Sequence, residues 1–171
     1  MEAFKIVGFA VLTAIAYGIA HDLVTAHLCV EYFSIAHPQV IADETPLRLA
    51  LVWGVLATWW MGLFFGLLLA FVARSGRGQK TGLKQLFRPV LAVAAVSLMA
   101  ALSAGLAGWL LYGLGIVGVP GGWASALAPE IHRSFTAVAY AHYASYLAAM
   151  IGAIIVICQT WRRRKARLAG A

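Results

Sequence analysis

The chain has 171 residues, of which 63% are hydrophobic and only 11% are charged. A soluble domain is about 45–50% apolar and about 25% charged, so a water-soluble fold of this size could not bury so much apolar surface. The composition therefore excludes a soluble globular protein and predicts an all-α, polytopic membrane protein. The net charge of +7 does not indicate a nucleic-acid partner, because the basic residues lie between long apolar runs and act there as topology signals.

Four apolar stretches are long enough to cross a membrane as helices, which takes about 20 mostly apolar residues. In chain order they cover about 4–29, 47–73, 89–114 and 134–159. We expect them to form a single transmembrane domain over 1–171, as an up-down bundle of four helices with no separate extramembrane domain. The outer connections 30–46 and 115–128 have no predicted conformation, and the second is glycine-rich but still apolar.

Small residues recur at four-residue spacing within two of these stretches. The third stretch carries Ser97, Ala101 and Gly105, and the second carries Gly62 and Gly66. This spacing places the small residues on one helix face, where they allow the backbones of neighbouring helices to approach closely. The pattern predicts tight helix packing in the bundle.

The basic residues define an orientation. Eleven of the 13 lie toward one side of the predicted bundle, namely Lys5, Arg74, Arg77, Lys80, Lys84, Arg88, Arg162, Arg163, Arg164, Lys165 and Arg167. The positive-inside rule then places both termini in the cytoplasm and predicts a multi-pass protein of the inner membrane. All five histidines and five of the six acids fall toward the opposite, outer side.

Three polar residues are predicted to meet near the outer edge of the membrane. With a rise of about 1.5 Å per residue, His21 and Asp22 lie about 24–26 Å above the inner boundary when counted from Lys5. His142 lies about 28 Å above it when counted back from Trp161. The first and fourth helices of an up-down bundle are neighbours, so these side chains are expected to converge. Polar groups in a lipid-spanning helix are costly and therefore point to a functional site.

Histidine and aspartate are common ligands of zinc, iron and copper, so these three residues suggest a site for a transition-metal ion or haem. Glu31 and His132 are weaker candidate ligands, because continued helices would carry them beyond the hydrocarbon layer. No HExxH or CxxC motif accompanies them. The two cysteines, Cys29 and Cys158, are predicted on opposite sides of the membrane and are not expected to form a disulfide.

Three functions remain open at this point. The first is a membrane protein that binds a metal ion or haem near its outer face. The second is a structural, assembly or sensory subunit of a larger membrane complex, with other membrane proteins or further copies of the chain as partners besides lipid. The third is an oligomeric ion or solute transporter, which is less favoured because no charge lies mid-membrane and no span is interrupted at its centre by glycine or proline. No catalytic residue is identified, and an enzymatic function stays undecided.

Overall fold

The computed structural model describes residues 1–169, whose regular secondary structure is helical, with no strand among them. Four helical stretches are long and apolar enough to cross a membrane: Glu2–Leu28, Pro46–Arg74, Leu83–Gly113 and Pro129–Arg167. The predicted all-helical class with four candidate spans is therefore confirmed. The third helix begins before the predicted 89, and the fourth continues well past 159, so both extend beyond the apolar stretch itself.

The second span consists of two helices, α3 (Pro46–Leu56) and α4 (Trp59–Arg74). At the break the Thr58 backbone N–H donates to the Val55 carbonyl, which leaves the Gly54 carbonyl without its helical donor. The Thr58 hydroxyl donates to that carbonyl at 2.5 Å instead. Such bonds from a threonine to the carbonyl four residues earlier bend helices. The second span is thus interrupted near its centre without glycine or proline at the break, because a threonine hydroxyl supports the interruption.

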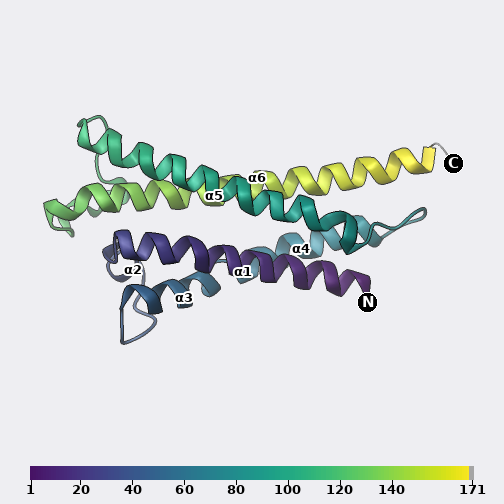
Figure 1. The fold of residues 1–171 in the computed structure, drawn as a ribbon, viewed down its shortest axis with the longest axis horizontal. Helices are drawn as coiled ribbons and strands as arrows, with labels where there is room; N and C mark the ends of the chain where they lie inside the picture. The colour runs from purple at the N-terminus through teal and green to yellow at the C-terminus, as the bar shows by residue number, and fades with distance from the viewer. Residues whose placement is uncertain (170–171) are drawn as a thin grey trace.

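The helices form two groups, which Figure 1 shows one above the other. In the amino-terminal group, α1 (Glu2–Leu28) packs against α3 and α4. In the carboxy-terminal pair, α5 (Leu83–Gly113) packs along α6 (His132–Ala169). The start of α1 and the end of α6 lie at the same end of the structure in this view.

Glycines allow the closest contacts, and these contacts lie within each group. A Cβ atom added to Gly18 of α1 would lie 2.3 Å from the Gly54 carbonyl oxygen of α3, and one added to Gly62 of α4 would lie 2.8 Å from the α1 backbone. In the carboxy-terminal pair, a Cβ added to Gly108 would lie 2.9 Å from the Tyr140 ring. The predicted small-residue packing thus joins α1 to α3 and α4, and α5 to α6.

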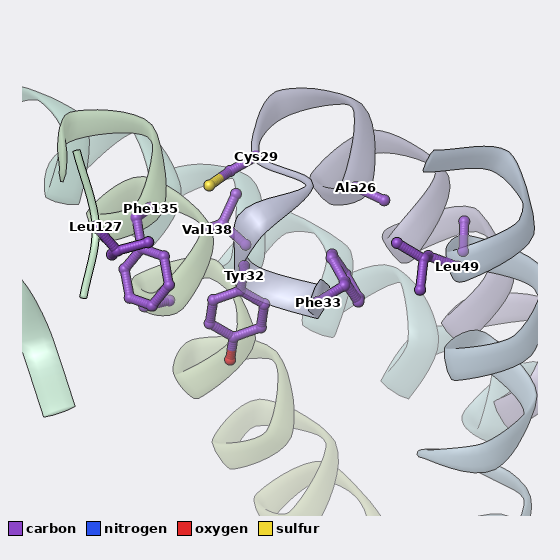
Figure 2. Packing of buried hydrophobic residues seen from close by; sticks show 10 residues of the cluster. Ala26, Cys29, Tyr32, Phe33, Leu49, Leu127, Phe135 and Val138 are labelled. Atoms are coloured by element: carbon purple, nitrogen blue, oxygen red, sulfur yellow. The ribbon is translucent and has the colours of Figure 1, made fainter. Parts of the chain in front are cut away.

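Two buried apolar clusters connect the groups near their ends, and both ends are named after the membrane side that the charge distribution predicts. The outer cluster, shown in Figure 2, contains Ala26, Cys29, Tyr32, Phe33, Leu49, Ala50, Leu127, Phe135, Val138 and Ala139. The inner cluster contains Ile6, Leu69, Ala70, Ala73, Leu86 and Val156. The interface between the two groups therefore has a buried apolar cluster near each of its ends.

The outer end is shaped by an early stop of α1. The helix ends at Leu28, and Cys29 is extended, with φ −158° and ψ 94°. The chain then turns into the short helix α2 (Glu31–Ser34), whose Tyr32 and Phe33 are buried. Two 3-10 turns, η1 (Pro120–Ser125) and η2 (Pro129–Ile131), connect α5 to α6 on this side. The segment after Leu28 thus returns over the bundle instead of continuing away from it.

At the inner end, Arg164 of α6 is bonded to the end of α4. Its Nη2 donates to the Ser75 carbonyl at 2.7 Å and its Nε donates to the Gln79 carbonyl at 3.2 Å. Its Nη1 donates to the Val72 carbonyl. Because the last carbonyls of a helix have no intrahelical donor, this guanidinium caps α4 and links the two groups.

Candidate metal site

His21 and Asp22 of α1 meet His142 of α6 at the interface between the two helix groups. One ligand atom from each residue lies within 4.8 Å of the other two. The side chains are buried, with exposures of 6% for His21, 4% for Asp22 and 5% for His142. Within residues 1–169, no second set of three or more histidine, cysteine, aspartate or glutamate side chains gathers in this way. The structure brings together the three residues that the helical rise placed at one depth.

The hydrogen bond made by one ring nitrogen of His142 determines the protonation of the other nitrogen, which faces Asp22. Its Nδ1–H donates to the Val138 carbonyl at 2.9 Å, because a carbonyl can only accept. Its Nε2 then faces the Asp22 Oδ1 at 3.3 Å. In a neutral imidazole of this tautomer, Nε2 carries a lone pair, and a lone pair facing a carboxylate is repulsive. A proton or a metal ion between the two atoms makes the contact favourable.

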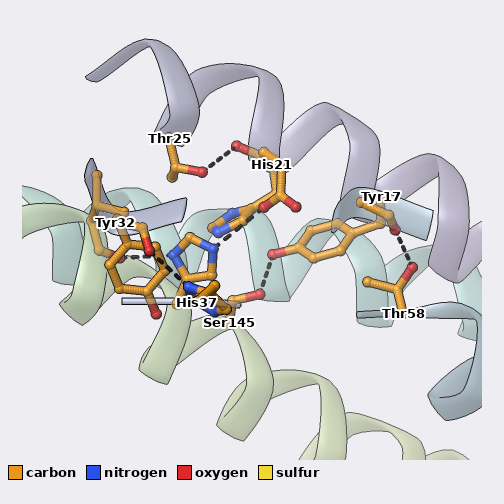
Figure 3. Close-up of polar contacts among 11 residues, drawn as sticks. Tyr17, His21, Thr25, Tyr32, His37, Thr58 and Ser145 are labelled. Atoms are coloured by element: carbon orange, nitrogen blue, oxygen red, sulfur yellow. Dashed lines mark hydrogen bonds and ion pairs between the residues drawn. The ribbon is translucent and has the colours of Figure 1, made fainter. Parts of the chain in front are cut away.

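His21 brings a buried nitrogen that has no partner. Its Nε2 makes no hydrogen bond, and leaving a buried polar atom unpaired costs about 1–3 kcal/mol. Its ring lies edge-on to the His142 ring, with centroids 4.5 Å apart, and stacks on Tyr17 at 5.8 Å. The nearby Thr25 hydroxyl is already used, because it donates to the His21 carbonyl at 3.2 Å, as Figure 3 shows. A bound ion would satisfy the unpaired nitrogen.

Helix α2 covers the site from the outer side. The Tyr32 ring stacks on His142 with centroids 4.5 Å apart, and Phe33 lies 5.6 Å from the same ring. His37 Nδ1–H donates to the Tyr32 carbonyl at 2.7 Å, and the His37 ring packs on Trp53 at 4.9 Å. Burial raises the pKa of the Tyr32 phenol, so this side chain remains neutral. The cover therefore adds mainly aromatic surface over His142.

The sequence did not predict this cover. The first span was predicted to end near residue 29, close to Leu28 where α1 ends, but no conformation was predicted for 30–46, which contains α2. His37 of the same segment packs against Tyr32 and Trp53. The extended Cys29 that turns the chain back is neither glycine nor proline, so no local residue type indicated the turn.

A hydroxyl pair and two cavities adjoin the site. The hydroxyls of Tyr17 on α1 and Ser145 on α6 lie 2.7 Å apart, which adds a second polar link between the groups. On the inner side of this link, an apolar cleft of about 130 Å³ lies between α1, α4, α5 and α6. On the other side, a cavity of about 270 Å³ between α1, α5 and α6 includes His21 in its wall. The site therefore lies beside spaces whose walls are mainly apolar.

Glu31, a weaker predicted ligand, does not join the group. Its carboxylate accepts a hydrogen bond from the Cys29 thiol, with a sulfur–oxygen distance of 3.4 Å. Burial, together with other contacts, raises the pKa of the Cys29 thiol to about 11, so Cys29 is a neutral donor at physiological pH. The pair stabilises the turn between α1 and α2.

His132, the other weaker candidate, is also outside the group. Its Nε2–H donates to the loop carbonyls of Ala124, at 3.1 Å, and Leu127, at 3.2 Å. Its Nδ1 accepts from the Tyr112 hydroxyl at 3.1 Å. Both ring nitrogens are thus used to hold the loop between α5 and α6, and this residue has a structural role.

No protein-family model, curated protein or solved structure matches the chain. The function is therefore argued from the chemistry of the site and from its surroundings. The four apolar helices are consistent with a membrane protein, and the group formed by His21, Asp22 and His142 could hold a metal ion.

Proposed function

We propose that the chain forms a single transmembrane domain that binds one divalent transition-metal ion through His21, Asp22 and His142. The observation that carries this proposal is the convergence of three buried ligand atoms within 4.8 Å of one another, contributed by two facing helices. The unpartnered His21 nitrogen and the His142 Nε2 turned toward the Asp22 carboxylate both favour a cation at this point. A bound ion resolves both features at once.

The donor set favours zinc or iron(II). Two imidazole nitrogens and one carboxylate oxygen form the ligand set of catalytic zinc sites and of the facial triad of non-haem iron. Three protein ligands leave at least one coordination position for water or a substrate, so the site resembles a catalytic centre more than a closed structural one. We infer metal-dependent chemistry near the outer face of the membrane.

A bare ion fits the site better than haem does. The His21 and His142 rings lie edge to face with centroids 4.5 Å apart, and the Tyr32 ring stacks on His142 at the same centroid distance. A porphyrin between the imidazoles would have to separate these rings, whereas an ion at a metal–nitrogen distance of about 2.1 Å can be reached by both of them.

The membrane placement follows the distribution of charge. In this proposal the bundle runs up and down through the inner membrane, with both termini and the arginine-rich end in the cytoplasm. The location of the start of α1 and the end of α6 at one end of the structure supports this topology (Figure 1). Exposed apolar side chains such as Phe71, at 69%, and Leu106, at 60%, suit contact with lipid. The metal site then lies near the periplasmic face.

A second candidate function is supported by the direct contacts across the interface. The Asp22–His142 contact at 3.3 Å and the Tyr17–Ser145 contact at 2.7 Å join the two helix groups without any ion. In this alternative the site is a polar clamp within a structural, assembly or sensory subunit, whose partners are other membrane proteins or copies of the chain. Oligomeric transport stays a further alternative, and none of the contacts described above specifically supports it.

Metal content distinguishes the two candidates. We expect detergent-purified protein, reconstituted with zinc or iron(II) and freed of excess metal, to retain about one ion per chain by elemental analysis. The variants D22N and H142A should lose this ion, because each removes one of three ligands. H27A is the matched control, since His27 is an exposed histidine of the same helix whose Nδ1 bonds the Leu23 carbonyl.

Two outcomes would contradict the metal site. Wild-type protein that remains metal-free after reconstitution, with unchanged thermal stability, overturns the metal site and favours the clamp. Equal loss of metal from H27A and H142A would show that the ion is bound at the surface and not between α1 and α6.

A further inference from the structure

The inner end of the bundle contains a polar pocket that is separate from the metal site. It has a volume of about 40 Å³ and lies between the start of α5 and the last turns of α6. Its polar lining consists of Thr81, Gln85, Gln159, Thr160, Arg163 and Arg167. This end of the molecule also carries most of the basic residues of the chain.

The two arginines of the pocket have no acidic partner. Arg163 and Arg167 are four residues apart on α6, so they lie on one helix face. Neither forms an ion pair within the part of the chain that the structure describes. Glu2 is the acid at this end, and it pairs with Lys5 at 2.8 Å. An anion at the pocket would therefore meet two uncompensated guanidinium groups.

The rest of the pocket offers further hydrogen-bonding groups. The Gln85 Oε1 accepts from the Gly82 backbone N–H at 2.9 Å, which leaves the side-chain NH₂ of Gln85 available as a donor. Pro89 lacks an N–H, so the Gln85 backbone carbonyl loses its usual helical donor. Arginine forks bind phosphate oxygens in a bidentate manner, and an amide donor complements them. These groups suit a phosphate with an attached polar head.

The apolar part of the wall indicates where that phosphate comes from. Leu86, Pro89 and Val156 line the pocket on its membrane side, and Val156 also lines the apolar cleft between the helix groups. The exposed surface beside the pocket is apolar, because Phe87, 46% exposed, follows Leu86 in the chain and Ile155, 47% exposed, precedes Val156. Acyl chains can lie against this surface, whereas a free phosphate would leave it unused. Basic pockets between membrane helices are typical sites for anionic lipid headgroups.

We propose that this pocket binds the phosphate of an anionic phospholipid from the leaflet on the arginine-rich side of the membrane. Arg163 and Arg167 bind the phosphodiester oxygens, Gln85 contacts the headgroup, and the acyl chains lie against the exposed apolar surface at Phe87 and Ile155. The site is independent of the metal centre, so either can be tested while the other fails.

The test compares two double variants of equal charge. Full-length protein is exchanged into vesicles of phosphatidylglycerol and phosphatidylcholine, re-extracted, and the lipid that remains bound is measured by native mass spectrometry. We expect wild-type protein to retain phosphatidylglycerol selectively, and R163Q/R167Q to lower this selectivity at least about tenfold, as expected for lost bonds to a charged group. The control R162Q/K165Q removes two charges of the same helix that do not line the pocket, and it should retain the selectivity.

Three results would overturn the proposal. Equal loss in both double variants would show that the whole basic surface attracts lipid and that no defined pocket exists. Retained selectivity in R163Q/R167Q, with an unchanged melting temperature, would place the lipid elsewhere. Displacement of phosphatidylglycerol by millimolar inorganic phosphate would show that the pocket recognises a free phosphate, because a lipid held by its chains as well should resist this competitor.

Discussion

The contacts within the two helix groups differ in kind from the contacts between them. Within a group, glycines bring backbones together, as at Gly18 and Gly54, where an added Cβ would meet a carbonyl oxygen at 2.3 Å. Between the groups, polar side chains meet and cavities remain, as at Asp22 and His142. In lipid, helices associate through close packing and polar contacts. The hydrophobic effect does not drive them together, because lipid tails are as apolar as the helix surfaces. The close contacts hold each group together, and the looser interface leaves room for a ligand.

The largest effect should come from breaking a close contact within the amino-terminal group. The substitution Gly18→Leu places a side chain where Gly54 and Thr58 of the second span already lie. Because backbone atoms cannot move aside, we expect a loss of about 3 kcal/mol or more, at the upper end of overpacking effects. The measurement is the yield of monodisperse protein and its melting temperature in detergent.

Gly8→Leu is the matched control for this change. It introduces the same side chain into the same helix, at a position where an added Cβ meets nothing within 4 Å. We expect a normal yield of folded Gly8→Leu and little folded Gly18→Leu. This result would support the distinction between the closely packed face of α1 at Gly18 and its open face at Gly8. Equal tolerance of both would contradict the packing described for α1 and α3.

The next effect concerns the link between the groups at the inner end. Arg164→Gln removes a guanidinium that bonds the carbonyls of Val72, Ser75 and Gln79. Since hydrogen bonds to charged groups contribute about 1.5–3 kcal/mol, we expect destabilisation of about 2 kcal/mol. Thermal unfolding in detergent measures it, and the exposed neighbour Arg162→Gln serves as control. An equal shift in both variants would mean that net charge, not the cap on α4, is responsible.

The smallest effect is expected between the groups beside the metal site. Tyr17→Phe removes the hydrogen bond to the Ser145 hydroxyl at 2.7 Å and leaves the ring in place. Interhelical bonds of this kind contribute about 0.6 kcal/mol on average in membranes, so the loss should be below about 1 kcal/mol. A double-mutant cycle with Ser145→Ala isolates the coupling, and Tyr143→Phe, at an exposed tyrosine, is the control. A coupling of zero would show that this contact adds nothing to the interface.

Much of the site follows from properties that are local in the sequence. Apolar length predicts the spans, and a constant rise per residue places His21, Asp22 and His142 at one depth. The break at Thr58 did not follow, because it depends on whether a hydroxyl takes over a backbone carbonyl. The cover by Tyr32 did not follow either, since hydropathy does not indicate the direction that the chain takes after α1.

The sequence by itself therefore indicated a lipid solvent, the helical class and the matching heights of His21, Asp22 and His142 along their helices, because lipid requires long apolar helices of regular rise. Only the tertiary structure decided that His142 turns its Nε2 toward Asp22, that α2 folds back over this pair, and that Arg163 and Arg167 face a pocket. These features depend on which helix faces meet and where helices stop. Both are set by contacts between residues that lie far apart in the chain, such as Asp22 and His142.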